Sequence, residues 1–217
     1  MKLLAIFAAA SLTGVFPQID KAPRYQFAGS DQLAFQILQG APADVFAAAA
    51  PKYPQELYAR GKCWKPVVFA TNTVVLIVPR ANPAHIRSVY DLRRPGIKLV
   101  VGAPGVPIGD YTRKLLAKLK LSSVLGNIVS NESDVKFVVA KVALGEADAG
   151  FAYKTDVKAV GSSVRRIALP AAGQPTVQYE LCIVRATKHL QAARAYVREV
   201  LSPRGREKLK AAGFGLP

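Results

Sequence analysis

Four places in the 217-residue sequence join an expected strand to an expected helix and so present backbone N–H groups at a helix start. They are Ser11, Ser30, Ile108 with Gly109, and the segment from Ser133 to Val135. First-turn amides have no partner inside their own helix, and the helix dipole adds partial positive charge, so helix starts bind anions. Serine is also the ordinary capping residue, so capping alone explains each serine taken singly. Four such junctions in one chain indicate a shared anionic target.

Signatures of catalysis are scarce in the sequence. Ser11 lies in AAASL and not in the GxSxG turn of serine hydrolases. The two histidines, His85 and His189, have no carboxylate at the spacing of a catalytic triad or a metal site. The segment GAPGVPIG (102–109) has neither the P-loop nor the dinucleotide-loop spacing of glycines. The sequence therefore predicts no enzyme, no metal ligands and no cofactor.

The chain has two cysteines, Cys63 and Cys182. Their separation matches neither a zinc motif nor a disulfide framework. Buried thiols are the favoured interpretation. A single long-range disulfide stays open for a protein outside the cytoplasm, where disulfides persist.

The charge balance is strongly basic, with 30 Lys and Arg against 14 Asp and Glu and a net charge of +16. The excess is divided equally between residues 80–177 and the two flanking segments together, so no basic arm accounts for it. The densest stretch, 188–210, lacks the interleaved aromatic residues of single-strand binders. We therefore expect no nucleic-acid partner. A diffuse positive field raises the local concentration of anions.

Apolar runs alternate with segments of helical period, which is typical of α/β proteins with parallel sheets. The expected strands are 3–8, 24–28, 45–48, 67–70, 74–78, 98–102, 149–152 and 164–168. The expected helices are 12–20, 31–39, 54–60, 89–93, 110–119, 134–144, 189–201 and 203–212. Residues 74–82 and 174–184 are interpreted as crossings between lobes. The pattern thus predicts lobe I from 1–78 plus 178–217, with lobe II (79–177) inserted into it.

The N-terminus begins like a secretory signal, with Met1-Lys2 followed by LLAIFAAAS. The apolar run is short and passes directly into a helix-start pattern at Ser11, so we assign it to the first strand and expect the signal peptide to be absent from this chain. No apolar stretch reaches the roughly 18 to 20 residues of a membrane-spanning helix. We therefore expect no segment that crosses a bilayer.

Five stretches together carry a resemblance to a known family. They are AAASLTGVF (8–16), QGAPADVFAAA (39–49), GAPGVPIGDYTRKLL (102–116), GEADAGFAYKTD (145–156) and SPRGREKLKAAGFG (202–215). In this order and spacing the chain resembles, over almost its whole length, the molybdate-binding proteins of bacterial ABC uptake systems, which are type II periplasmic binding proteins. The resemblance implies a two-lobed α/β fold, with each lobe a mainly parallel sheet flanked by helices and a ligand cleft between the lobes.

The resemblance also implies a function and a set of ligand donors. The function is capture of molybdate or tungstate by a monomeric periplasmic, or extracellular and membrane-associated, protein that delivers the anion to an ABC permease. The implied donors are the hydroxyls of Ser11 and Ser30, the backbone N–H groups of Ile108 and Val135, and the phenol of Tyr153. The molybdenum or tungsten atom is then held through the oxygens of the oxyanion. No protein atom coordinates the metal directly, and no cofactor is implied. A fully deprotonated oxyanion needs donors only, and a carboxylate would repel it.

The chain departs from the family pattern at several positions. Ile108 stands where the family usually has alanine, and Gly29 replaces the first serine of a pair. Asp31, Asp110 and Asp134 follow or neighbour implied donors. Carboxylates at helix starts stabilise their own helices, whereas one facing the ligand would accept a hydrogen bond from a protonated anion. The alternative is therefore the same fold binding another oxyanion, such as phosphate, or a small carboxylate.

Overall fold

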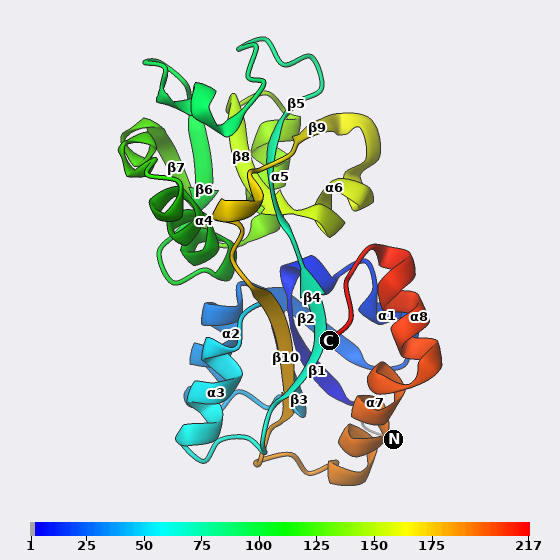
Figure 1. The fold of residues 1–217 in the computed structure, drawn as a ribbon. Helices are drawn as coiled ribbons and strands as arrows, with labels where there is room; N and C mark the ends of the chain where they lie inside the picture. Colours follow the sequence, from blue (N-terminus) through cyan, green and yellow to red (C-terminus); the bar gives the residue numbers. More distant parts are fainter. Residues whose placement is uncertain (1–2) are drawn as a thin grey trace. The chain divides into compact units, whose positions relative to one another are not determined.

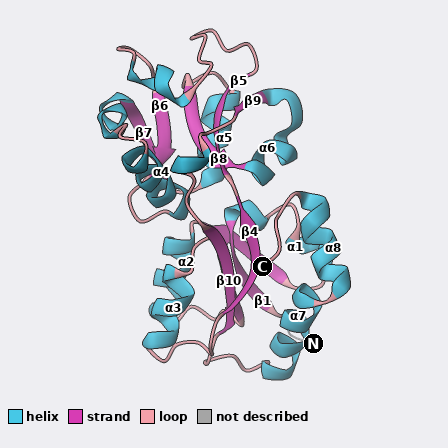
Figure 2. Ribbon diagram, in the orientation of Figure 1, coloured by secondary structure: helices cyan, strands magenta, loops and turns pink. Residues whose placement is uncertain are grey.

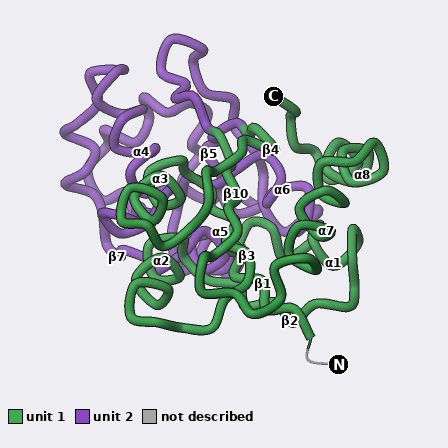
Figure 3. Tube along the Cα trace, turned by 90° about the horizontal axis from the view of Figure 1, so that it is seen from below, with its two compact units in different colours: residues 1–72, 178–217 green, residues 73–177 purple. Residues whose placement is uncertain are grey.

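The computed structural model describes residues 3–217 and divides the chain into two compact units. Of the described residues, 3–72 and 178–217 form unit 1 and 73–177 form unit 2 (Figure 3). Each unit has one five-stranded sheet with helices packed around it (Figure 2). Unit 2 is thus a continuous insertion in unit 1.

The sheet of unit 1 has the strand order β2-β1-β3-β10-β4. Its strands are β1 (Ala5–Ala9), β2 (Arg24–Ala28), β3 (Val45–Ala48), β4 (Val67–Asn72) and β10 (Val177–Ile183). Strand β1 runs parallel to both β2 and β3, and β10 runs antiparallel to β3. The central strands β1 and β3 are almost wholly buried, as expected for short apolar runs covered by helices on both faces.

Helices cover both faces of this sheet, with α2 and α3 on one side and α1, α7 and α8 on the other (Figure 1). Their bounds are η1 (Ala10–Leu12), α1 (Phe16–Ile19), α2 (Ser30–Leu38), α3 (Lys52–Ala59), α7 (Leu190–Leu201) and α8 (Pro203–Ala212). Helix α8 shows the expected start and stop signals. The hydroxyl of Ser202 accepts the N–H of Gly205, Pro203 fills the first position, and Gly213 ends the helix with a φ of 101°.

The sheet of unit 2 has the order β7-β6-β8-β5-β9. Its strands are β5 (Val74–Pro79), β6 (Leu99–Gly102), β7 (Ile128–Glu132), β8 (Ala149–Tyr153) and β9 (Val164–Ile167). Its helices are η2 (Val89–Arg93), α4 (Pro107–Lys118), η3 (Ser122–Asn127), α5 (Val135–Ala143), α6 (Lys154–Val160), η4 (Gly161–Ser163) and η5 (Ala171–Gly173). Strand β6 is parallel to β7 and β8, whereas β5 is antiparallel to β8 and β9.

Several sequence-based expectations need correction. Each sheet contains the expected parallel strands but is mixed, because β10 runs antiparallel to β3, and β5 runs antiparallel to β8 and β9. The first boundary falls between Asn72 and Thr73 and not after Val78, because β5 pairs with strands of unit 2. The expected helix 12–20 is reduced to η1 and the four-residue α1.

Strand β7 was not predicted at all. It is an edge strand whose side chains are mostly half-buried or exposed, so its sequence, IVSNE, contains no continuous apolar run.

Candidate functional site

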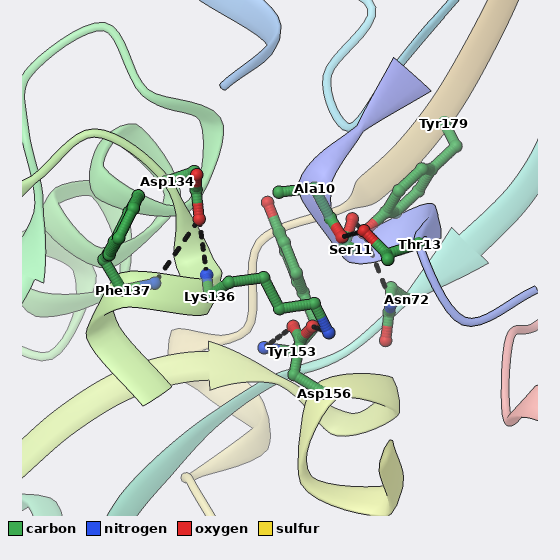
Figure 4. Close-up of polar contacts among 10 residues, drawn as sticks. All are labelled: Ala10, Ser11, Thr13, Asn72, Asp134, Lys136, Phe137, Tyr153, Asp156 and Tyr179. Carbon is green, nitrogen blue, oxygen red and sulfur yellow. Dashed lines mark hydrogen bonds and ion pairs between the residues drawn. The ribbon is translucent and has the colours of Figure 1, made fainter. Parts of the chain in front are cut away.

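The first expected donor, Ser11, lies in η1 directly after β1. Its hydroxyl is 2.9 Å from the hydroxyl of Tyr179 on β10, and the side-chain amide of Asn72 donates to the same Tyr179 oxygen over 3.4 Å (Figure 4). The Thr13 hydroxyl donates to the carbonyl of Ala10 at 2.7 Å and closes this short turn. A chain of hydroxyl and amide groups therefore fixes the orientation of the buried Ser11 side chain.

Ser30 is the first residue of α2, and the N-cap is Gly29. The expectation that Ser30 caps a helix beginning at Asp31 is therefore wrong by one position. The Ser30 hydroxyl oxygen instead accepts the backbone N–H of Ala49, just beyond β3, at 3.1 Å. Because the oxygen accepts this N–H, the hydroxyl hydrogen of Ser30 is available to donate to a further group.

The two serines are brought to one edge of the unit 1 sheet. Strands β1 and β2 are parallel, and their register pairs Ala9 with Ala28. Ser11 and Ser30 each follow two residues beyond this pair. Both therefore lie at the carboxyl ends of adjacent parallel strands, which is where α/β sheets bind their ligands.

Ile108 is the second residue of α4, after the N-cap Val106 and Pro107. Its N–H belongs to the first helical turn, where amides find no acceptor within the helix. The carboxylate of Asp110 accepts the N–H of Gly105 at 2.9 Å, so it stabilises the loop that leads into α4. This contact supports the interpretation of Asp110 as a structural carboxylate.

The start of α4 approaches the end of β6 very closely. A Cβ at Gly109 would lie 2.3 Å from the carbonyl oxygens of both Gly102 and Ala103, and a Cβ at Gly102 would lie 2.7 Å from the nitrogen of Gly109. Backbone packs directly on backbone here, which only glycine permits. The two glycines thereby fix the position of the Ile108 amide.

We expect Gly109→Ala to lower the free energy of unfolding by about 1 to 3 kcal/mol, because the helix start must move to relieve overpacking. Urea denaturation followed by circular dichroism measures the change. Gly126→Ala is the matched control, since a Cβ there meets nothing within 4 Å, and should stay within about 0.5 kcal/mol of the wild type. Equal stabilities of the two variants would contradict the close approach.

Val135 is the first residue of α5, and the cap is Asp134 rather than Ser133. The Asp134 carboxylate accepts the backbone N–H of Lys136 at 2.7 Å and that of Phe137 at 3.4 Å (Figure 4). Burial raises the pKa of Asp134, although these two hydrogen bonds oppose the shift. The N–H of Val135 precedes both capped amides, so the cap leaves it to other acceptors.

Tyr153 ends β8 and is almost completely buried, with its ring perpendicular to that of Tyr111 at a centroid distance of 6.5 Å. Its backbone N–H donates to the carboxylate of Asp156 at 3.2 Å. The other oxygen of Asp156 lies 3.0 Å from the ammonium of Lys136, the second residue of α5 (Figure 4). This ion pair connects the end of β8 to the start of α5.

Three of the expected donors are therefore positioned by one edge of the unit 2 sheet. Ile108 follows β6, Val135 follows β7 and Tyr153 ends β8, and these strands are mutually parallel neighbours in the sheet. The carboxyl ends of parallel strands meet at the same edge. Unit 2 thus repeats the arrangement seen in unit 1.

Sequence reasoning missed the residues that support the donors. Tyr179 and Asn72 orient Ser11, and Lys136 with Asp156 joins two elements of unit 2. The only available signal was Asp156, three residues after Tyr153, at a position where carboxylates commonly stabilise a helix start. The others become apparent only when distant strands and helices are placed together.

Two further observations concern residues 3–217. Within this range, no group of three or more His, Cys, Asp or Glu side chains is arranged to hold a metal ion. Over the same range, no helix has both the length and the apolar character needed to cross a membrane.

Comparison with known proteins gives consistent matches over nearly the whole chain. The family described as bacterial extracellular solute-binding protein matches residues 5–215. Molybdate-binding protein ModA of Mycobacterium tuberculosis strain H37Rv is 37% identical over 224 residues, which cover 99% of this chain and 85% of that protein. ModA of Haemophilus influenzae is 31% identical, covering 97% of this chain and 89% of its own.

Solved structures give the same fold. The periplasmic molybdate-binding protein of Azotobacter vinelandii superimposes with a TM-score of 0.86 at 22% identity, covering 99% of both chains. The substrate binding domain of a putative molybdenum ABC transporter from Clostridium difficile gives a TM-score of 0.70 at 27% identity and covers 99% of this chain and 98% of its own.

Proposed function

The chain belongs to the bacterial extracellular solute-binding proteins, and we propose that it captures molybdate or tungstate and delivers the anion to the permease of an ABC transporter. The names of its relatives support this ligand, since the ModA proteins of two bacteria share 31% or more of their aligned residues with it. The proposal places the protein outside the cytoplasm, in the periplasm or attached to the outer face of a membrane, as a monomer that needs no cofactor and catalyses no reaction.

We assign five donors to the anion. Unit 1 supplies the hydroxyls of Ser11 and Ser30, and unit 2 supplies the N–H groups of Ile108 and Val135 and the phenol of Tyr153. A tetrahedral dianion without protons can accept hydrogen bonds at every oxygen and donate none. Oriented hydroxyls and first-turn amides replace its water shell without placing a fixed positive charge on it.

The observation that carries the proposal is that the hydroxyls of Ser11 and Ser30 are oriented by their neighbours so that each can donate a hydrogen bond to an anion. The Ser30 oxygen already accepts the N–H of Ala49, so its hydrogen is available for another acceptor. Asn72 donates to the Tyr179 oxygen, and Tyr179 can donate in turn to Ser11, which then presents its own hydrogen. Both serines can therefore act as donors to an anion.

The contacts of Asp110 and Asp134, two of the three aspartates beside the assigned donors, support molybdate over a protonated anion such as phosphate. The alternative requires a carboxylate that accepts a hydrogen bond from the ligand. Asp134 is occupied by two amides of its own helix, and Asp110 accepts the N–H of Gly105. Neither observation favours phosphate or a small carboxylate.

Isothermal titration of the whole chain with molybdate, tungstate, sulfate and phosphate, each added separately at neutral pH, tests the ligand. Tight binding of the two metal oxyanions without binding of sulfate or phosphate is expected. Binding of phosphate without molybdate would overturn the ligand assignment, and heat from none of the four would overturn the oxyanion class.

The same titration tests the donors. Ser11→Ala, Ser30→Ala and Tyr153→Phe should each weaken molybdate binding by about 1.5 to 3 kcal/mol, or about 10-fold to 150-fold, because each removes one hydrogen bond to a charged ligand. Ser123→Ala and Tyr58→Phe, at exposed positions, are the matched controls and should bind like the wild type. Unchanged affinity in all three donor variants would show that the anion binds elsewhere.

A further inference from the structure

The only two cysteines of the chain meet in the core of unit 1. Cys63 follows α3 and forms an antiparallel bridge with Val184, just beyond β10. The N–H of Trp64 donates to the carbonyl of Ile183 at 2.9 Å, and the N–H of Arg185 donates to the carbonyl of Lys62 at 2.8 Å. These two bonds lie on either side of the Cys63–Val184 pair, so Cys63 and Val184 share no backbone hydrogen bond with each other. In an antiparallel ladder, the side chains of such a pair lie close together.

Cys182 lies two residues before Val184, so its side chain is on the same face of the strand as those of Val184 and Cys63. Residues in this diagonal relation are neighbours on one face of an antiparallel pair. Burial, and then the hydrogen bond with Cys63, raise the pKa of the Cys182 thiol. They belong to a single cluster of buried side chains together with Phe46 and Leu57.

The surroundings of the thiols suit a structural bond rather than a reactive site. Cys63 is 0% exposed and Cys182 is 2% exposed. The Cys63 thiol also donates a weak hydrogen bond to the carbonyl of Pro54 at 3.6 Å. A raised thiol pKa and a buried position both reduce the reactivity of a cysteine in the folded protein.

We propose that Cys63 and Cys182 form a disulfide bond in the exported protein. The family is extracellular, and disulfides form and persist in oxidising compartments. The two thiols lose two protons and two electrons as the sulfur–sulfur bond forms. A partner disulfide, either a small-molecule disulfide or that of a thiol oxidase, accepts them and becomes two thiols. Because both sulfurs are buried in the folded unit, this exchange takes place while the chain folds.

The bond would join the two separate segments that build unit 1. Cys63 belongs to the segment before unit 2 and Cys182 to the segment after it. The closed loop therefore includes the whole of unit 2, and long loops gain most from closure in the chain-entropy account of disulfides. The inference concerns the stability of unit 1 and is independent of the ligand.

Thiol labelling tests the proposal directly. The whole chain, purified from an oxidising periplasm without reductant, is denatured, treated with N-ethylmaleimide and weighed by mass spectrometry. No label is expected before reduction and two labels after it, with the chain running as a monomer on a non-reducing gel. Two labels without reduction, or a disulfide between chains, would overturn the proposal.

The same chain produced in a reducing cytosol is the control, and it should take up two labels without reduction, which shows that the reagent reaches both thiols. The thermal midpoint of the oxidised protein should exceed that of the reduced protein by about 8 to 16 °C. Cys63→Ser/Cys182→Ser should resemble the reduced wild type. Equal midpoints for oxidised and reduced wild type would overturn the stabilising role of the bond.

Discussion

Replacing Lys136 by methionine should lower the free energy of unfolding by about 3 to 5 kcal/mol at neutral pH, because it leaves a buried carboxylate without its cation. Asp156 is 1% exposed, and the ammonium of Lys136 lies 3.0 Å from one of its oxygens. Methionine keeps much of the volume of the lysine stem, so the loss reports the charge rather than a cavity. Urea denaturation measures the difference.

The deficit of Lys136→Met should depend on pH in a definite direction. Burial raises the pKa of Asp156, and the charge of Lys136 opposes this shift, so the pKa rises further when the lysine is removed. The folded variant therefore binds a proton more tightly than the unfolded chain does. Its stability falls as the pH rises from the ordinary aspartate pKa through the raised one, and it recovers as the pH falls through that window.

Two further variants separate this explanation from a general loss of packing. Lys114→Met, at an exposed position on α4, should change stability by less than about 0.5 kcal/mol. Adding Asp156→Asn to Lys136→Met should recover much of the loss, since it removes the uncompensated charge. A deficit that is the same at every pH, or that persists in the double variant, would exclude the buried charge as its cause.

Phe16→Ala should cost about 3 to 5 kcal/mol of unfolding free energy, the range for deleting a buried aromatic ring. Phe16 is 0% exposed and begins α1. Its ring centroid lies 6.3 Å from that of Tyr25, 5.7 Å from that of Phe69 and 6.1 Å from that of Tyr196. The substitution would leave a cavity bordered by three rings that cannot collapse into it together.

The matched control for this cavity is Phe35→Ala on α2, where the ring is 63% exposed. We expect it to stay within about 0.5 kcal/mol of the wild type. Denaturant midpoints, recorded by tyrosine fluorescence, compare the two variants. If both lost the same stability, the aromatic cluster around Phe16 would not be a principal support of unit 1.

Much of the fold was predictable because its central strands are short apolar runs between helix signals. Strands β1, β3 and β6 and helices α2 and α8 lie within about two residues of their expected places. Strand β7 was missed because an edge strand does not need to be apolar on both faces. The place of β5 in unit 2 depends on its pairing with β8, which no local pattern reveals.

The candidate site, like the fold, could be predicted from the sequence only in part. The five donors could be proposed because the motifs that carry the family resemblance, among them AAASL and GFAY, are local features of the sequence. The residues that hold the donors in place could not be predicted, because they make their contacts across long separations in the sequence. Tyr179 reaches Ser11 from 168 positions away, and the Lys136–Asp156 pair links two helix starts in the fold. The contact of Cys63 with Cys182 likewise required the register of the strands around Val184.

The strand order of unit 1 leads us to expect a definite order of events when the chain folds. Strand β10 lies between β3 and β4 in the sheet, yet it is made after the whole of unit 2. Until residues 177–183 emerge, β3 and β4 have no shared neighbour, whereas unit 2 is continuous and has all its strands. A chain that emerges from its N-terminus therefore completes the inserted unit first. The surrounding unit closes last, by a contact of high sequence separation, which is the slow kind of step in folding.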